Sequence, residues 1–321
     1  MTEPTHHSPP SGRVLIIAGS DSGGGAGIQG DIKTVSALGG YAMTAITALT
    51  AQNTLGVFGI HPIPEAFIAQ QIDLCLSDIG ADAIKTGMLH SAGVIETVVS
   101  CLDAHSGGKP SPLGGEGLDE GAANRTQANF HIPSPNPLPQ GERACPASPL
   151  VPIPLIVDPV MVAKGGAPLL EAAALHALKT LLIPAATIIT PNLPEAELLL
   201  GRSIASGDAD ATDMKRAAEE LLGLGCEAVL LKGGHGTGDV LTDILVTRHQ
   251  APGTKHLLTL TAKRIATLST HGTGCTFASA IATGLAQKQT LHDAVVRAHA
   301  YVQAAIARAP NFGKGNGPLG H

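Results

Sequence analysis

Two glycine-containing segments carry residue types suited to holding an anion. The segment His271-Gly-Thr-Gly-Cys275 opens a stretch in which Phe277 and Ile281 recur at helical spacing. Glycine-flanked backbone amides at the start of a helix form a site for an oxyanion or a phosphoryl group in transfer. We expect Cys275 in the first helical turn, where the positive end of the helix lowers the pKa of a thiol. The alternative for this cysteine is a small buried residue without a chemical role.

The second segment, Gly23-Gly-Gly-Ala-Gly27, precedes another predicted helix. Its glycines would let backbone amides approach a ligand closely, and a helix start favours negative charge. The segment lacks the Lys-Ser/Thr pair of a Walker A loop, and its Gly25-Ala-Gly-Ile-Gln-Gly30 pattern runs past the predicted helix start. Two roles for this segment therefore stay open: it binds an anion, or it forms a turn required only for packing.

Further polar side chains come directly after apolar runs. Asp158 follows one such run, Asn192 and Glu195 follow another, and Lys232 follows a third. Oxygen ligands suit Mg²⁺, and phosphoryl transfer uses such a cation to bridge phosphates. A lysine followed by two glycines suits contact with a nucleotide phosphate. The alternatives are that the two carboxylates are solvated helix caps and that Lys232 is an ordinary exposed lysine.

The apolar runs before these residues are predicted strands. They cover 13–18, 42–51, 57–63, 83–85, 154–157, 186–189 and 228–231, with 240–248 and 256–262 as antiparallel edge strands. Helices are predicted up to Gly39, over 64–77, 91–104, 170–182, 194–200 and 213–224, from about 274, and over 291–308.

This alternation of strands and helices predicts an α/β fold of three layers, in which helices cover both faces of a mostly parallel central sheet. The carboxyl ends of parallel strands share one edge, and open sheets of this kind bind ligands there. The sequence therefore predicts that the polar clusters gather at one edge of the sheet.

The domain organisation follows from composition along the chain. Residues 1–12 are polar and are expected to be a disordered tail, and residues 13–321 are expected to form a single domain. The stretch 105–153 is predicted to be a low-complexity insertion, because ten of the 23 prolines fall between 105 and 154 and no periodicity is present. It lies before a strand start, at the opposite end of the sheet from the polar clusters. We therefore expect activity to survive its deletion; a functional lid is the alternative.

Composition excludes several classes of protein. The net charge of −6 and the aromatic content of 2% argue against a nucleic-acid partner. No apolar run approaches the roughly 20 residues that span a bilayer, and the start lacks a secretory signal, so we expect no membrane partner. The five cysteines are scattered without a Cys-x-x-Cys pair, which favours reduced thiols and a cytoplasmic location.

Seven segments, in order along the chain, carry a resemblance to a known family. They are Ala18–Lys33, Thr47–Thr54, Lys85–Leu89, Asp158–Met161, Thr190–Ala196, Lys232–His235 and His271–Cys275. Together they resemble the hydroxymethylpyrimidine/phosphomethylpyrimidine kinases of thiamine biosynthesis, within the ribokinase superfamily. The resemblance implies a ribokinase-like fold, use of ATP and Mg²⁺, and a homodimer. It also implies two phosphorylations, first of 4-amino-5-hydroxymethyl-2-methylpyrimidine and then of its monophosphate.

The resemblance also implies roles for individual residues on the substrate side. Gln52 would bind the edge of the pyrimidine, because an amide offers both a donor and an acceptor. Four further positions would complete the substrate pocket: Gly19, Asp31, Met88 and Val160.

The remaining implied roles concern phosphate and metal. The ATP side would be formed by Asn192, Lys232 and Gly234, and Mg²⁺ would be organised by Asp158 and Glu195. The anion hole would be formed by Gly272, Thr273 and Gly274, and Lys164 would steady the phosphates from a flap. Cys275 stands where most sugar kinases of the superfamily use an aspartate as base, so its thiolate would accept the substrate proton in the first phosphorylation. The second needs no base, because a phosphate monoester is already largely ionised.

Three other functions are weighed against this one. A pyridoxal kinase of the same superfamily would also act on a heterocycle that bears a hydroxymethyl group. A Rossmann-type oxidoreductase needs an acidic ribose ligand about 20 residues after its glycines, and the corresponding window, Ala45-Ile-Thr-Ala48, holds no acid. A non-catalytic pyrimidine-binding module would bind the ligand without consuming ATP.

Overall fold

The computed structural model describes residues 9–105, 152–162, 169–205, 211–234, 238–248 and 255–321. Lys164, residues 1–8 of the predicted tail and residues 106–151 of the predicted insertion lie outside these ranges. The last helix before the insertion ends at His105, and the next strand begins at Leu155.

The described strands form one nine-stranded sheet in the order β3-β2-β1-β4-β5-β6-β7-β8-β9. Their bounds are β1 Arg13–Asp21, β2 Tyr41–Asn53, β3 Gly56–Pro62, β4 Ala83–Thr86, β5 Leu155–Val157, β6 Ile188–Ile189, β7 Ala228–Leu231, β8 Val240–Arg248 and β9 Lys255–Lys263. The six strands from β2 to β7 in this order are parallel. Strand β3 is antiparallel to β2, β8 to β7, and β9 to β8. The predicted mostly parallel sheet is confirmed.

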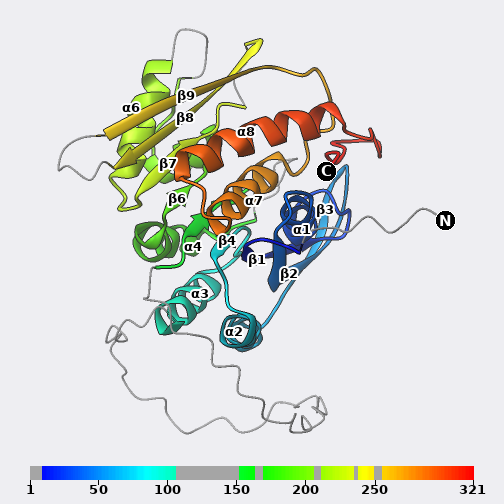
Figure 1. The fold of residues 1–321 in the computed structure, drawn as a ribbon, viewed down its shortest axis with the longest axis vertical. Helices are drawn as coiled ribbons and strands as arrows, with labels where there is room; N and C mark the ends of the chain where they lie inside the picture. The colour runs from blue at the N-terminus through cyan, green and yellow to red at the C-terminus, as the bar shows by residue number, and fades with distance from the viewer. Residues whose placement is uncertain (1–8, 106–151, 163–168, 206–210, 235–237, 249–254) are drawn as a thin grey trace, which may run out of the picture.

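Among the described residues, eight α-helices accompany these strands, and the last two follow β9 (Figure 1). Their bounds are α1 Gly27–Ala37, α2 Glu65–Leu74, α3 Ala92–His105, α4 Ala172–Ala177, α5 Leu193–Leu200, α6 Ala211–Leu222, α7 Thr273–Ala286 and α8 Leu291–Ala307. Two predicted helices are shorter than expected, because π-helical turns over Cys75–Ile79 and Leu178–Leu182 replace their last α-helical turns. Among the described helices, none is both long and apolar enough to cross a membrane.

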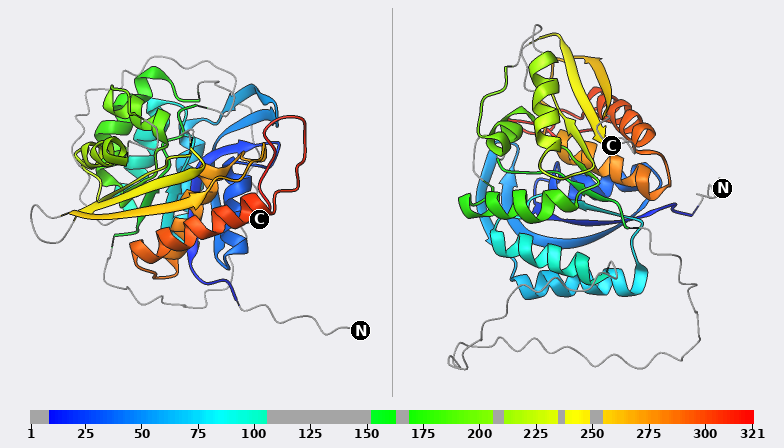
Figure 2. Two further views of the ribbon diagram at one scale, coloured as in Figure 1. Left: turned by 90° about the horizontal axis from the view of Figure 1, so that it is seen from above. Right: turned by 90° about the vertical axis from the view of Figure 1, so that its left-hand side faces the viewer.

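The alternating side chains of β1 show how the three layers form. Val14 and Ile16 point to one face of the sheet, where they belong to a core shared with residues of α1, α7 and α8. Leu15 and Ile17 point to the other face, into a core shared with α2, α3 and α6. All four side chains are fully buried, as expected for a parallel strand covered on both faces. Figure 2 shows the helices on the two sides of the sheet.

The connection from β1 to α1 requires glycine. Gly27 begins α1 with a φ of +54°, and a Cβ atom there would overlap the carbonyl oxygen of Gly19. Gly19 lies against Met88, whose flexible Cε atom would have to shift to admit a Cβ atom on Gly19. These close approaches bring the carboxyl end of β1 and the segment after β4 together at the edge of the sheet.

Candidate active site

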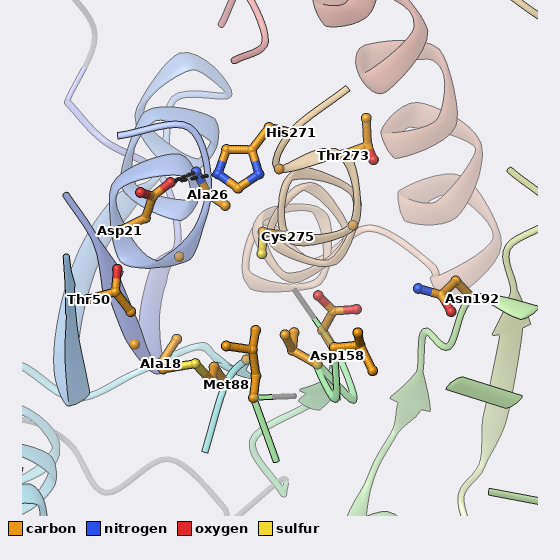
Figure 3. Close-up of a pocket in the computed structure, with 18 of the residues that line it drawn as sticks. Ala18, Asp21, Ala26, Thr50, Met88, Asp158, Asn192, His271, Thr273 and Cys275 are labelled. Carbon is orange, nitrogen blue, oxygen red and sulfur yellow. Dashed lines mark hydrogen bonds and ion pairs between the residues drawn. The ribbon is translucent and has the colours of Figure 1, made fainter. Parts of the chain in front are cut away.

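A cavity of about 300 Å³ lies at the carboxyl edge of the parallel strands (Figure 3). Gly19 at the end of β1, Lys85 at the end of β4 and Asp158 just after β5 line it. Asn192 after β6 and Lys232 after β7 line its other side. The prediction that polar clusters at these strand ends gather at one edge is confirmed.

Most of the predicted site residues meet in this cavity. Those that line it are Gly19, Gln52, Met88, Asp158, Val160, Asn192, Glu195, Lys232, Gly272, Thr273, Gly274 and Cys275. Gln52 and the start of α7 therefore face the same small space, as a substrate held by one and phosphorylated at the other requires.

Two predicted residues lie away from the lining. Asp31 is fully buried within α1, behind Lys85, and is not among the lining residues. Gly234 lies beyond Lys232, outside the lining, and its carbonyl oxygen accepts a hydrogen bond from Arg264. Lys164 falls outside the described residues.

The first residues of α7 line the cavity. Gly272 is the N-cap residue with a φ of +86°, and a Cβ atom on it would overlap the carbonyl oxygen of Gly25. The first amides of a helix have no partner within the helix, and they carry its positive end. A Cβ atom on Gly274 would lie 3.1 Å from Lys232 Nζ. The amides and a lysine ammonium group thus converge on the place where an anion would bind.

The glycine-rich loop after β1 is organised by Asp21, which the sequence analysis assigned no role. Its carboxylate accepts hydrogen bonds from the backbone N–H groups of Gly23, Gly25 and Ala26 at 2.8, 3.1 and 2.8 Å. Burial acts to raise the pKa of Asp21, but these bonds and the contact with His271 hold it below its usual range. Because the carboxylate uses these amides, the structure favours the packing alternative for this loop.

Gln52 extends from β2 toward the start of α7. Its side-chain nitrogen lies 3.1 Å from Nε2 of His271, and the same Nε2 lies 2.8 Å from Asp21 Oδ2. His271 therefore links the predicted substrate residue with the glycine-rich loop. The signal for it in the sequence was its place at the head of the His-Gly-Thr-Gly-Cys segment, directly before the predicted amide site.

A buried ion pair forms the floor of the cavity. Lys85 Nζ donates to both carboxylate oxygens of Asp31, at 3.0 and 2.8 Å, and Ser279 of α7 donates to one of them at 2.6 Å. Burial acts to lower the pKa of Lys85, but the carboxylate of Asp31 raises it well above its usual value. Asp31 was expected to line the substrate pocket, but it instead holds Lys85 through these two hydrogen bonds.

The opposite wall carries the other lysine and two carboxylates. Lys232 Nζ lies 3.0 Å from Asp158 Oδ1, which also accepts a hydrogen bond from Thr190 at 2.9 Å. Burial acts to raise the pKa of Asp158, yet Lys232 and Lys85 hold it below its usual value. Glu195 forms a capping box with Asn192 at the start of α5. Burial raises the pKa of Glu195 to about 7, against the opposing effect of Lys232.

These two carboxylates fit a magnesium site. Both line the cavity, and burial and the neighbouring Asp158 raise the pKa of Glu195, an effect that a bound divalent cation would oppose. Within the described ranges, no three His, Cys, Asp or Glu side chains are grouped to hold a metal ion alone. A cation here would therefore complete its ligands with water and phosphate oxygens, as Mg²⁺ commonly does.

The expected lowering of the Cys275 pKa is wrong. Burial raises the pKa of this thiol to about 12, although the positive charge of Lys85 acts in the opposite direction. The largest cause is the cost of placing a thiolate in surroundings with little water. In Figure 3, Cys275 lies between Thr50 on one side of the cavity and Asn192 on the other.

A sheet edge that gathers free amides and oppositely charged side chains around one small cavity is the arrangement of a small-molecule kinase with a ribokinase-like fold. Comparison with known proteins makes the assignment more specific. The chain belongs to the phosphomethylpyrimidine kinase family, whose model matches residues 21–110 and 149–320. The matched ranges leave out most of the predicted insertion.

Individual relatives agree with this family. The hydroxymethylpyrimidine/phosphomethylpyrimidine kinase of Bacillus subtilis is 41% identical over 310 residues, covering 96% of this chain and 94% of the relative. The thiamine biosynthesis bifunctional protein ThiED of Geobacter sulfurreducens is 44% identical over 315 residues, covering 97% of this chain. This chain spans about half of that bifunctional relative, 52% of its length.

Solved structures agree as well. Phosphomethylpyrimidine kinase from Clostridium difficile has a TM-score of 0.66 at 36% identity, covering 92% of this chain and 99% of that one. An ADP complex of Bacillus subtilis pyridoxal kinase has a TM-score of 0.74 at 28% identity, covering 97% of both chains. The ribokinase-like fold and the kinase activity inferred from the sequence are confirmed.

Proposed function

We propose that this chain uses ATP and Mg²⁺ to phosphorylate the hydroxymethyl group of 4-amino-5-hydroxymethyl-2-methylpyrimidine, and then phosphorylates the resulting monophosphate to the diphosphate. The observation that carries the proposal is that Gln52 and the amides at residues 272–275 line one cavity of about 300 Å³. A small heterocycle held by the first can present its hydroxymethyl group to the second.

The heterocycle would bind on the side of the cavity formed by β1, β2 and the segments that follow β4 and β5. Gln52 supplies a donor and an acceptor, and Gly19, Met88 and Val160 supply surface around the ring. Because Gly19 has no side chain, Met88 can pack against the backbone there, and both residues line the cavity.

The transferred phosphoryl group would lie between the start of α7 and the lysines. The amides of residues 272–274 and the ammonium groups of Lys85 and Lys232 would stabilise its equatorial oxygens. The proposed contacts to ATP are made by Asn192, Lys232 and Gly234. Gly234 would contact the part of ATP farthest from the cavity, because it lies outside the lining. Asp158 and Glu195 are proposed to hold Mg²⁺, which when bound neutralises charge on the phosphates.

Cys275 is proposed to accept the proton of the substrate hydroxyl in the first phosphorylation. Its thiolate is disfavoured by burial, so the neighbouring charge of Lys85 is needed to support it. The second phosphorylation starts from a phosphate monoester, which is already ionised and needs only alignment and neutralisation of charge. The two steps therefore differ in their need for Cys275.

Pyridoxal is a second candidate substrate. The observation that favours it is the TM-score of 0.74 to a pyridoxal kinase, compared with 0.66 to a phosphomethylpyrimidine kinase. The fold thus fits kinases for either heterocycle, and the contacts made by Gln52 must decide between them.

An ATP-coupled assay tests the proposal. The pyrimidine alcohol, its monophosphate and pyridoxal are supplied separately, and the monophosphate and diphosphate products are resolved by chromatography. We expect phosphorylation of both pyrimidines at higher kcat/KM than pyridoxal. Turnover of pyridoxal alone, or binding of the pyrimidine without consumption of ATP, contradicts the proposal.

Other features of the proposal rest on the sequence. We propose that residues 13–321 act as one domain, with the insertion 105–153 outside the catalytic machinery. A cytoplasmic location and a homodimer remain predictions, to be tested by cell fractionation and by light scattering of the purified protein.

A further inference from the structure

His271 lines the cavity directly before the start of α7, and it takes no part in the chemistry proposed above. Its Nε2 atom lies 2.8 Å from Asp21 Oδ2 and 3.1 Å from the side-chain nitrogen of Gln52. The ring packs over Gly25, where a Cβ atom would come within 2.6 Å of His271 Cδ2. The imidazole therefore has little room to move, and its Nε2 atom has a fixed pair of neighbours.

The contact with Asp21 determines where the imidazole carries a proton. Asp21 accepts three hydrogen bonds from backbone N–H groups of the glycine-rich loop, which favour its ionised form. An ionised carboxylate can only accept, so Nε2 of His271 must carry a hydrogen and donate it to Asp21. A nitrogen that carries this hydrogen has no lone pair to accept a bond from the NH₂ group of Gln52.

Thr50 imposes the same constraint from the other end of the Gln52 side chain. Its Oγ1 donates to the backbone oxygen of Ser20 at 2.8 Å and lies 3.2 Å from Gln52 Oε1. A hydroxyl group carries one hydrogen, and the shorter bond to Ser20 uses it. The oxygen of Thr50 is then an acceptor, so the end of Gln52 that faces it should be a donor.

Turning over the amide of Gln52 relieves both constraints, because its oxygen and nitrogen then exchange places without a change of shape. The oxygen then shares the one Nε2 hydrogen that His271 donates more closely to Asp21, at 2.8 Å compared with 3.1 Å. We infer that His271, held by Asp21, acts with Thr50 to fix Gln52 with its carbonyl oxygen toward His271 and its NH₂ group toward Thr50, and that this polarity selects the heterocycle. The inference rests on the proposed function, in which Gln52 contacts the pyrimidine. His271 and Thr50 are positioning residues, because they act through Gln52.

The fixed polarity leaves one free hydrogen-bonding capacity at each end of the amide. The oxygen keeps a second lone pair, and the nitrogen keeps a second hydrogen. The 4-amino group and the adjacent ring nitrogen of the proposed substrate offer a donor beside an acceptor, so they match this pair. The 4-oxo analogue, 5-hydroxymethyl-2-methylpyrimidin-4-one, offers an acceptor beside an N–H donor and would oppose like groups. Sites that pair polar groups in this way reject mismatched ligands strongly.

The ratio of kcat/KM for the 4-amino compound to that for the 4-oxo analogue tests the inference. The unaltered chain should favour the amino compound by about 10³-fold or more. His271→Ala frees the amide to turn over and should reduce the ratio at least about tenfold, mainly through KM. His271→Gln, whose side-chain NH₂ group can donate in place of Nε2, should restore most of it. Thr50→Val and Thr50→Ser form the second matched pair, with loss expected in the first and retention in the second.

The ratio is insensitive to partial unfolding, because both substrates are measured on one preparation of each variant. Equal losses for both substrates in His271→Ala and Thr50→Val, with the ratio unchanged, would overturn the inference while leaving the proposed function standing. Failure of the unaltered chain to phosphorylate the amino compound would overturn the proposed function, and the inference with it. The two failures are therefore distinguishable.

Discussion

Replacement of Cys275 by alanine should separate the two phosphorylations. Only the first requires removal of a proton from a hydroxyl group, and a positioned general base typically contributes about 10²–10⁴-fold to such a step. We therefore expect Cys275→Ala to lower kcat/KM for the alcohol by about 10²-fold or more, and to change kcat/KM for the monophosphate far less. Cys75→Ala is the matched control, because Cys75 lies in the turn after α2 and is not among the residues lining the cavity.

The dependence on pH adds a second, quantitative part to this prediction. Burial raises the pKa of Cys275 to about 12. Below that pKa the thiolate fraction rises about tenfold for each unit of pH. The rate of the first step divided by that of the second should therefore increase between pH 7 and pH 9 in the unaltered chain, and should be flat in Cys275→Ala. Division by the second step removes the effect of groups common to both.

The assay follows the two products from ATP separately by chromatography, at subsaturating concentrations of each pyrimidine. Equal losses in both steps would remove Cys275 from the role of base. A ratio of rates that stays flat with pH in the unaltered chain would show that a thiolate with this raised pKa does not limit the first step.

Three further predictions concern charge and backbone. Lys85→Met should lower the free energy of unfolding by about 3–5 kcal/mol, because the buried carboxylate of Asp31 loses its partner; urea titration measures this, and a loss below about 1 kcal/mol contradicts it. Binding of Mg²⁺ with an unreactive ATP analogue should tighten from pH 6 to pH 8, because Glu195, with its pKa raised to about 7, ionises over this range; calorimetry on Glu195→Gln should show a weaker dependence. Deletion of 106–151 should preserve both phosphorylations in the coupled assay, because α3 ends and β5 begins away from the carboxyl edge of the sheet; a folded but inactive variant contradicts this.

The sequence predicts the position of the site well because the signal for it is local. Short apolar runs that end in polar or glycine-rich clusters identify the strands, and parallel strands bring those ends to one edge. The lining of the cavity by Asp158, Asn192 and Lys232 follows from this rule. The two predicted helices that are shorter than expected continue into π-helical turns, which helical periodicity alone does not distinguish.

What the sequence misses depends on partners that are distant along the chain. Asp31 pairs with Lys85, 54 positions away, and so supports the cavity from below instead of facing the substrate. Asp21 meets His271, 250 positions away, and no spacing rule predicts that contact. The pKa of Cys275 follows from surroundings that desolvate its thiol and that form only in the folded chain.

A crystal structure with the aminopyrimidine alcohol and an unreactive ATP analogue tests the central claim most directly. The account predicts the 4-amino group and the adjacent ring nitrogen within hydrogen-bonding distance of Gln52, and the hydroxymethyl oxygen turned toward the amides of residues 272–275 and the terminal phosphate. A ring bound away from Gln52, or a terminal phosphate held away from the start of α7, would contradict it.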